Sequence, residues 1–308
     1  MSTFDNFCSD LTIVVQGPWH INLCQSLLQL KRLFPGSQII WSSFLNDKTY
    51  EVPDFVERVH TTDPGALDRS DYGGRTNCSM RRQVANFAAG LKIANRKYLL
   101  KIRSDLYIFD RSIVLLFLEC KSKNADFFVV NSESTHKPSV LFPSYCHFGD
   151  WVFIGNRRSF DPILSIDVNE LRDVEIGEMN YFERFRRSVS RIGNQTTSCE
   201  MEIWKPVLKH CMPNLVIPEK SFEVSNKIKS SHATLKKNHF KLVTASKDGY
   251  MLLKADYFRA EWKHQHSYDR DQYNRPLFFG NFRLWRLRFL KLVYRYYCFA
   301  LNFGIQKR

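Results

Sequence analysis

The chain has 308 residues, of which 44% are hydrophobic and 25% are charged. These proportions are those of a globular protein, and they exclude a collagen-like, low-complexity or disordered chain. Lys and Arg number 45 against 31 Asp and Glu, so the formal net charge is +14, which points to an anionic partner such as nucleic acid or a membrane surface.

Strand and helix patterns alternate at the start of the chain. Short apolar runs typical of buried strands occupy residues 11–15, 38–44 and 55–59, and apolar residues recur at helical spacing over 21–34. The first run ends at Gln16-Gly17-Pro18, where glycine and proline indicate a loop. This order of elements predicts an α/β sheet.

A polar loop and an amphipathic helix come next. Asp63-Pro64-Gly65 opens the loop, and residues 80–94 place their apolar side chains on one helical face. The side chains predicted to point away from that face are Arg81, Arg82, Gln83 and Asn86.

Residues 98–105 then form an apolar strand whose last residues are polar. These residues are Arg103, Ser104 and Asp105. Ligands bind at the carboxyl ends of strands in open parallel sheets, so we expect these side chains to lie at a site.

The pattern continues as far as residue 211 and then weakens. A helix over 113–118, strands over 126–131 and 147–155, and a helix ending at Cys211 are indicated in turn. Residues 213–280 alternate short strand-like pieces with Lys-rich loops.

The basic charge is concentrated at the end of the chain. Residues 272–308 carry eight Lys or Arg and no Asp or Glu. On a helix, Arg288, Lys291 and Arg295 form one stripe, and aromatic and apolar residues fall opposite. We therefore predict a basic amphipathic helix over 283–308 that lies on an anionic membrane surface. Binding to nucleic acid would instead favour basic and aromatic side chains on the same face.

Three features of the sequence predict a cytoplasmic location. No apolar run reaches the roughly 18 residues of a spanning helix, and no apolar stretch of a signal peptide is present near the N-terminus. The 8 cysteines include no Cys-x-x-Cys pair, so we expect free thiols in a reducing compartment.

The polar residues at the predicted strand ends suit a nucleoside diphosphate. Arg82 and Arg103 would neutralise phosphates, while Asp105 would hold ribose or a divalent cation, or would merely cap the segment that follows. No Gly-x-Gly-x-x-Gly follows the first strand and no P-loop motif is present, which argues against dinucleotide and P-loop sites.

Two carboxylates are candidates for a general base that removes a proton from an attacking hydroxyl. Asp150 lies in a Gly-Asp-Trp elbow, and Glu200 lies at the start of a predicted helix. Their alternative roles are those of a turn residue and of a partner for the helix dipole. His264 and His266 are candidate ligands of a metal or a phosphate, or simply exposed loop residues.

Six motifs in a fixed order carry a family resemblance. They are Thr12–Pro18, Phe34-Pro35-Gly36, Asp63-Pro64-Gly65, Asn77 with Arg82-Gln83, Tyr98–Leu106 and Asp150–Gly155. Together they resemble the WavE lipopolysaccharide-synthesis family, bacterial proteins regarded as glycosyltransferases. The resemblance implies a GT-A-like, and so Rossmann-like, nucleotide-sugar-binding sheet flanked by helices.

The resemblance also implies a reaction and a site. The reaction is transfer of a sugar from a nucleotide-sugar donor to a lipopolysaccharide core, O-antigen or capsule acceptor, with Glu200 close to the place of the catalytic carboxylate. The residues expected at the donor are Gln16, Gly17, Pro18, Asp63, Arg82, Gln83, Arg103 and Asp105. Arg103-Ser104-Asp105 stands where GT-A enzymes carry an Asp-x-Asp metal motif. We therefore expect Mg²⁺ or Mn²⁺ at Asp105, and His266, named above from the residues, is the candidate second ligand. Arg103 in place of the first Asp implies either a weaker metal dependence or a diphosphate neutralised partly by Arg103.

The expected organisation has three parts. Residues 1–212 form the catalytic domain, with the donor half up to about residue 110 and the acceptor half over 111–212; residues 213–282 pack on it, and 283–308 form the membrane-associating tail. We expect a peripheral protein on the inner face of the cell membrane that binds a lipid-linked or oligosaccharide acceptor and no nucleic acid. The alternatives are a sugar-phosphate or polyol-phosphate transferase on the same fold and a nucleic-acid-binding protein.

Overall fold

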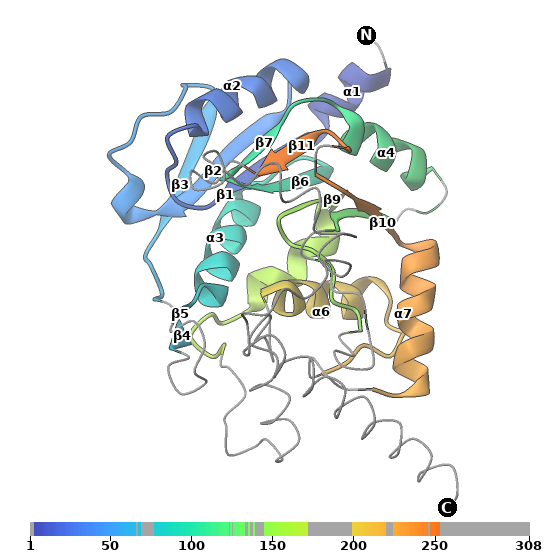
Figure 1. Cartoon of the computed structure of the whole chain (residues 1–308). Helices are drawn as coiled ribbons and strands as arrows, with labels where there is room; N and C mark the ends of the chain where they lie inside the picture. The colour runs from blue at the N-terminus through green and yellow to red at the C-terminus, as the bar shows by residue number, and fades with distance from the viewer. Residues whose placement is uncertain are drawn as a thin grey trace, which may run out of the picture.

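A seven-stranded sheet forms the centre of the protein in a computed structural model (Figure 1). The model describes residues 3–65, 67–68, 77–122, 124, 126–132, 135, 138, 145–171, 199–219, 224–245 and 247–252. The sheet order is β10-β8-β9-β6-β1-β2-β3. Its strands are β1 (Leu11–Gln16), β2 (Gln38–Phe44), β3 (Val56–Thr61), β6 (Tyr98–Arg103), β8 (Phe128–Asn131), β9 (Val152–Asn156) and β10 (Phe240–Val243).

The strands are parallel with one exception. β1 pairs in parallel with β2 on one side and with β6 on the other, and β2 continues to β3. β9 is antiparallel to both β6 and β8, and β10 is parallel to β8. The chain therefore builds outward from β1 in two directions, which creates a crevice beside the end of β1.

Helices cover both faces of the sheet (Figure 1). One face carries α1 (Thr3–Ser9), α2 (Leu23–Leu33) and α4 (Ser112–Lys121). The other carries α3 (Met80–Ile93), α6 (Cys199–Cys211), α7 (Asn226–Asn238) and the 3-10 helix η3 (Arg157–Ser165). The remaining short elements are η1 (Leu45–Asp47), β4 (Leu67–Asp68), β5 (Asn77–Cys78), β7 (Leu106–Ile108) and β11 (Tyr250–Leu252).

Alternate residues of the central strands point into two separate hydrophobic cores, one on each face of the sheet. On β1, Ile13 and Val15 pack with α2 and α4, whereas Val14 packs with α3. A strand buried on both faces needs a continuous apolar run rather than an alternating one, and residues 11–15 have such a run. The second core is rich in aromatic rings, and Trp204 on α6 lies at its centre, fully buried against Phe128, Phe153 and other rings.

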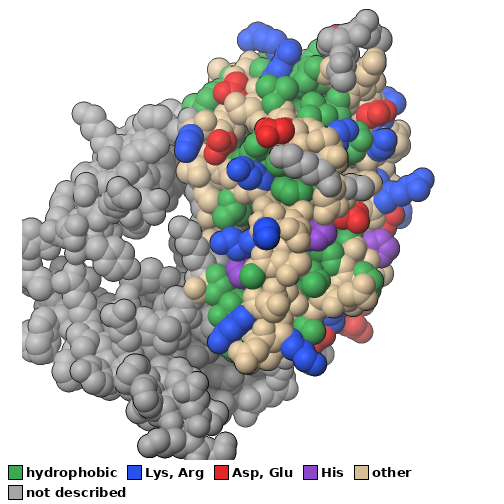
Figure 2. Space-filling view, turned by 90° about the vertical axis from the view of Figure 1, so that its right-hand side faces the viewer, with side chains coloured by type: hydrophobic (Ala, Val, Ile, Leu, Met, Phe, Trp, Pro, Cys, Tyr) green, Lys and Arg blue, Asp and Glu red, His purple; other side chains and the backbone are tan. Residues whose placement is uncertain are grey.

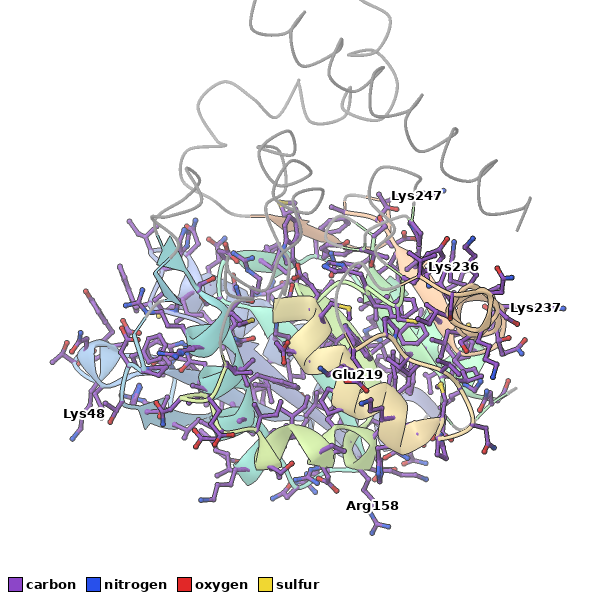
Figure 3. All side chains as sticks on the ribbon, turned by 90° about the horizontal axis from the view of Figure 1, so that it is seen from below. Lys48, Arg158, Glu219, Lys236, Lys237 and Lys247 are labelled. Atoms are coloured by element: carbon purple, nitrogen blue, oxygen red, sulfur yellow. The ribbon has the colours of Figure 1, made fainter. Side chains whose placement is uncertain are left out.

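Most elements predicted from the sequence are confirmed, but the prediction for residues 213–280 is wrong in one segment. The sequence predicts alternating strand-like pieces and Lys-rich loops there, whereas residues 226–238 form α7. Ser225 caps this helix by accepting a hydrogen bond from the Ile228 amide, and its outer face carries lysines such as Lys236 and Lys237 (Figure 3). The apolar stripe is too narrow for the periodicity to be read, because only Ile228, Leu235 and smaller residues contribute to it.

The predicted tail helix over 283–308 and the loop with His264 and His266 lie outside the described residues. None of the described helices has the length and apolar character needed to cross a bilayer. On the side of the molecule that carries α4 and α7, Lys and Arg side chains are scattered among acidic and apolar ones (Figure 2). The division at residues 212 and 282 stays a prediction, and β10, which follows the first of these boundaries, pairs with β8 of the central sheet.

His232 on α7 makes stability sensitive to acid. Its Nδ1 accepts a hydrogen bond from the Cys146 amide at 3.1 Å, and burial lowers its pKa from 6.5 to about 4, with a smaller contribution from Lys236. Between pH 6.5 and about pH 4, His232 binds a proton in the unfolded chain but stays neutral in the folded protein. The free energy of unfolding therefore falls as the pH falls through this range. Lowering the pH from about 7 to about 5 should reduce the free energy of unfolding by about 2 kcal/mol.

Urea unfolding of the wild type and of His232→Gln at both pH values measures this effect. We expect the wild type to lose about 2 kcal/mol more than the variant, because only the wild type carries this titrating group. An equal loss in the two proteins would contradict the assignment to His232.

Candidate functional site

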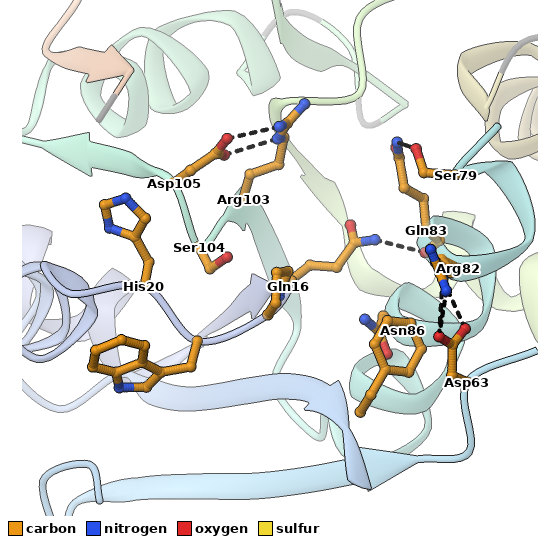
Figure 4. Close-up of a pocket in the computed structure, with 14 residues that line it drawn as sticks. Gln16, His20, Asp63, Ser79, Arg82, Gln83, Asn86, Arg103, Ser104 and Asp105 are labelled. Atoms are coloured by element: carbon orange, nitrogen blue, oxygen red, sulfur yellow. Dashed lines mark hydrogen bonds and ion pairs between the residues drawn. The ribbon is translucent and has the colours of Figure 1, made fainter. Parts of the chain in front are cut away.

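A cavity of about 590 Å³ opens where the carboxyl ends of β1, β2 and β6 meet the start of α3 (Figure 4). It is lined by Gln16, Gly17, Pro18, Trp19, His20, Phe44, Asp63, Ser79, Arg82, Gln83, Asn86, Arg103, Ser104 and Asp105. All eight residues predicted to bind the donor are among them. The cavity lies at the crevice beside β1, where the direction of the sheet order reverses.

Arg103 and Asp105 form an ion pair on one side of the cavity (Figure 4). Arg103 Nε lies 2.9 Å from Asp105 Oδ1, and Nη2 lies 2.7 Å from Oδ2. This two-point contact is the arrangement that a guanidinium makes with a planar anion. The guanidinium also lies over the Trp151 ring, 5.4 Å from its centroid.

A second pair joins Arg82 to Asp63 on the other side of the cavity (Figure 4). Arg82 Nε lies 2.8 Å from Asp63 Oδ1, and Nη2 lies 2.6 Å from Oδ2. The hydrogen bonds from Arg82, with a further one from the Gly65 amide, hold the pKa of Asp63 below its ordinary value. Each arginine of the cavity is thus already matched by a carboxylate, and both pairs are partly exposed.

Gly17 brings the turn after β1 close to the end of β6. Its φ is +129°, and a Cβ at this position would lie 2.5 Å from Ser104 Oγ. The Ser104 amide donates to the Gln16 carbonyl at 2.7 Å, which ties the two strand ends together. Glycine is therefore required for the wall of the cavity to close as it does.

Gln16 and Asn86 are deeply buried polar residues of the cavity wall, with 4% and 2% of their surface exposed. Gln16 Nε2 donates to the backbone carbonyl of Gln83 at 2.6 Å, and the backbone carbonyl of Asn86 accepts from Ser42 Oγ at 2.5 Å. The prediction that Asn86 points away from the buried face of its helix is wrong. The helix lies closely on β1 and β2 at Gly90, and this close approach covers the neighbouring turn.

The two candidate bases are not among the residues described as lining the cavity, and each has a basic partner of its own. Asp150 is paired with the fully buried Lys101, with 3.9 Å between Lys101 Nζ and Asp150 Oδ2, and only 2% of its side chain is exposed. Glu200, in the first turn of α6, has Oε2 3.8 Å from His147 Nε2 and keeps 10% of its side chain exposed. Asp150 lies near the cavity, because Trp151, which follows it, contacts Arg103.

The donors for a metal ion are few. Within the described ranges, no group of three or more His, Cys, Asp or Glu side chains is arranged to hold a metal. Asp105 offers hard carboxylate oxygens at the cavity, which suits Mg²⁺ or Mn²⁺ when substrate phosphates supply further ligands. His266, the other predicted ligand, lies outside the described residues.

A comparison with protein families gives the identity of the chain at family level. The model described as WavE lipopolysaccharide synthesis matches residues 11–297. The chain belongs to the WavE lipopolysaccharide synthesis family. Membership confirms the resemblance seen in the six motifs and supports the expectation of a glycosyltransferase. No curated protein sequence matches the chain.

Solved structures provide distant likenesses. The mannosyltransferase PcManGT from Pyrobaculum calidifontis, in complex with GDP-Man and Mn²⁺, is 9% identical with a TM-score of 0.35, over 52% of this chain and 48% of its own. The 4-diphosphocytidyl-2C-methyl-D-erythritol synthase of Anaerococcus prevotii is 9% identical with a TM-score of 0.37, over 83% and 95%. The galactosyltransferase LgtC, in complex with donor and acceptor sugar analogues, is 11% identical with a TM-score of 0.35, over 76% and 73%.

The chain thus spans about half of the mannosyltransferase. At such low identities, donor, acceptor and mechanism have to be argued from the residues of this member of the WavE family.

Several cavity residues were missed by the sequence patterns. They are Trp19, His20, Phe44, Ser79 and Asn86. Phe44 is the last residue of a predicted strand, so the strand-end rule that found Asp105 also applies to it.

Proposed function

We propose that this protein is a glycosyltransferase that moves a sugar from a nucleotide-sugar donor to a lipopolysaccharide core, O-antigen or capsule acceptor. The observation that carries the proposal is the cavity beside the end of β1, with an arginine–carboxylate pair on each side. Crevices at this position of an α/β sheet bind nucleotides, and arginine forks suit phosphate oxygens. Membership of the WavE family agrees with this reaction.

Donor binding would exchange ion pairs for phosphate contacts. The Arg103 guanidinium already presents two parallel N–H groups to Asp105, and a diphosphate oxygen pair can take the place of that carboxylate. Asp105 would then be free to hold Mg²⁺ or Mn²⁺, which when bound neutralises the leaving diphosphate. Arg103 would supply the same neutralisation from the protein side.

Transfer would need a base for the acceptor hydroxyl. As the acceptor oxygen bonds to the anomeric carbon, the bond from that carbon to the nucleoside diphosphate breaks, and the hydroxyl proton passes to a carboxylate. We propose Glu200 or Asp150 for this role. Glu200 is favoured because more of its side chain is exposed and because His147 stands beside it.

A panel of nucleotide-sugars tests the proposal. The melting temperature is measured with UDP-, GDP-, CMP- and dTDP-sugars, each with and without Mg²⁺ or Mn²⁺. A donor at about a hundred times its Kd should raise the melting temperature by about 5 °C. If no nucleotide-sugar raises it, the proposal is wrong. The mass of the product separates sugar transfer from sugar-phosphate transfer, which adds phosphorus and releases a nucleoside monophosphate.

We also propose that residues 283–308 hold the enzyme on the anionic inner face of the cell membrane, beside a lipid-linked acceptor. The support is the basic stripe opposite an aromatic face in that segment. Deleting residues 283–308 should abolish cosedimentation with anionic vesicles while donor binding stays within about twofold, since the cavity is built by other segments. Persistent vesicle binding after the deletion would refute this role for the tail.

A further inference from the structure

Two acceptor oxygens in the wall of the cavity have no hydrogen-bond partner. Gln16 Oε1 and Asn86 Oδ1 are buried, and no described residue donates to either of them. An unmade hydrogen bond to a buried acceptor is unfavourable, so such atoms mark places where a bound group completes the structure. Both residues line the cavity, so a ligand held there is the group in position to meet them.

The orientation of the Gln16 amide is fixed by its neighbour. Its Nε2 donates to the Gln83 carbonyl at 2.6 Å. Turning the amide over would bring two acceptor oxygens together, so the oxygen must face away from Gln83. Gln16 therefore presents an acceptor, and not a donor, to whatever lies beside it.

Asn86 and Gln16 differ in their distance from the Arg103–Asp105 pair. In Figure 4, Asn86 lies on the side opposite the Arg103–Asp105 pair, and Gln16 lies between them. The Asn86 backbone is bound to Ser42 of β2, and β2 ends at Phe44, whose side chain also lines the cavity. An aromatic ring beside neutral acceptors is an environment for a nucleobase, which stacks on its face and hydrogen-bonds at its edge.

We infer that Gln16 and Asn86 read the base of the donor, and that they select a base with a ring N–H next to a carbonyl group, namely uracil, thymine or guanine. This inference rests on the proposed function, which places the diphosphate at Arg103. Cytosine and adenine carry an acceptor nitrogen at the corresponding ring position and donate only through the exocyclic amino group beside it. A base seated with that ring nitrogen against Gln16 Oε1 therefore sets two acceptors against each other. A site built to hydrogen-bond one group discriminates strongly against an analogue that lacks it.

Binding of nucleoside diphosphates to the wild-type chain tests the inference. The Kd values of UDP, dTDP, GDP, CDP and ADP are measured by calorimetry with Mg²⁺ present. We expect at least one of UDP, dTDP and GDP to bind at least about tenfold more tightly than both CDP and ADP, a difference of about 1.4 kcal/mol. Equal binding of all five would overturn the inference and leave the proposed function standing, whereas binding of none would overturn both.

Comparing the Kd of 2′-deoxy-UDP with that of UDP separates the contribution of the ribose from that of the base. The two ligands differ only in one hydroxyl group. If removal of this hydroxyl lowers affinity at least tenfold while the base makes no difference, the amide oxygens serve the ribose and the inference is wrong.

Variants assign the effect to the two side chains. Gln16→Leu and Asn86→Leu should each weaken binding of the preferred nucleoside diphosphate at least about tenfold and change binding of pyrophosphate, which has no base, less than twofold. Gln29→Leu on α2, outside the cavity lining, is the matched control and should change neither. Equal weakening of both ligands would overturn the assignment, and if a variant does not fold, the wild-type panel still decides the base preference.

Discussion

Replacing Arg103 by Ala, or Asp105 by Asn, should lower the rate of sugar transfer by about a hundredfold or more. Removing one preorganised group that stabilises developing charge typically has an effect of this size. In Arg103→Ala the diphosphate loses its two-point partner, and in Asp105→Asn the cavity loses the carboxylate oxygens that suit a divalent cation. The measurement is steady-state transfer from the donor identified by the nucleotide-sugar panel, over a range of Mg²⁺ concentrations.

The two variants should differ in their response to metal. Asp105→Asn should need a higher Mg²⁺ concentration for half-maximal rate, whereas Arg103→Ala should keep the wild-type value and lose rate at every concentration. Arg103→Lys should recover only part of the rate, because a lysine keeps the charge but not the two-point geometry.

Asp161→Asn is the matched control for Asp105→Asn. Asp161 is also paired with an arginine, Arg157, but it lies on η3 and does not line the cavity. We expect normal transfer in this variant. Normal transfer in both Arg103→Ala and Asp105→Asn would refute the donor site.

Eight residues of the cavity lining could be predicted because they follow local patterns. A buried strand that turns polar at its carboxyl end identifies Gln16 and Arg103 from their immediate neighbours in sequence. Asp63 and Arg82 stand at a loop and at a helix start, and the structure joins them. The end of a strand and the start of a helix can be recognised without knowing which elements become neighbours in the fold.

Asn86 could not be predicted, because its environment depends on distant segments. Its backbone partner is Ser42, 44 positions away in the chain, and its burial depends on the close contact of Gly90 with Val14. On the sequence alone a polar residue in an amphipathic helix is placed on the solvent side. The same limitation hid α7, in which lysines fill the outer face and few apolar residues mark the inner one.

The direction of β9 was also beyond the sequence. Residues 152–156 are an apolar run that predicts a strand, yet nothing within the run says that it lies antiparallel between β6 and β8. That placement brings the Gly-Asp-Trp elbow beside the end of β6, where Arg103 contacts Trp151. Asp150 therefore comes near the cavity through a pairing that only the folded chain defines.

The two candidate bases should be separable by comparing catalysis with stability. Lys101 is fully buried, so Asp150→Asn leaves its charge less well matched, and breaking a buried pair typically costs about 3–5 kcal/mol. We expect Asp150→Asn to unfold at a clearly lower urea concentration and to lose activity in proportion to the folded fraction. That result would mean that the Asp150 side chain acts by holding Lys101 and the Gly-Asp-Trp elbow in place.

Glu200→Gln should instead lower kcat by at least about a hundredfold, because a general base contributes at least that factor. The urea midpoint should change little, because the amide keeps the size of the side chain. Glu202→Gln on the same helix is the matched control, since Glu202 is half-buried and burial raises the pKa of its carboxyl. The kcat of this control should stay within about threefold of the wild type. The decisive readout is the pH profile of kcat, whose acidic limb should disappear in Glu200→Gln and remain in Glu202→Gln. If neither Glu200→Gln nor Asp150→Asn lowers kcat a hundredfold in folded protein, neither carboxylate is the base, and the acceptor proton leaves by another route.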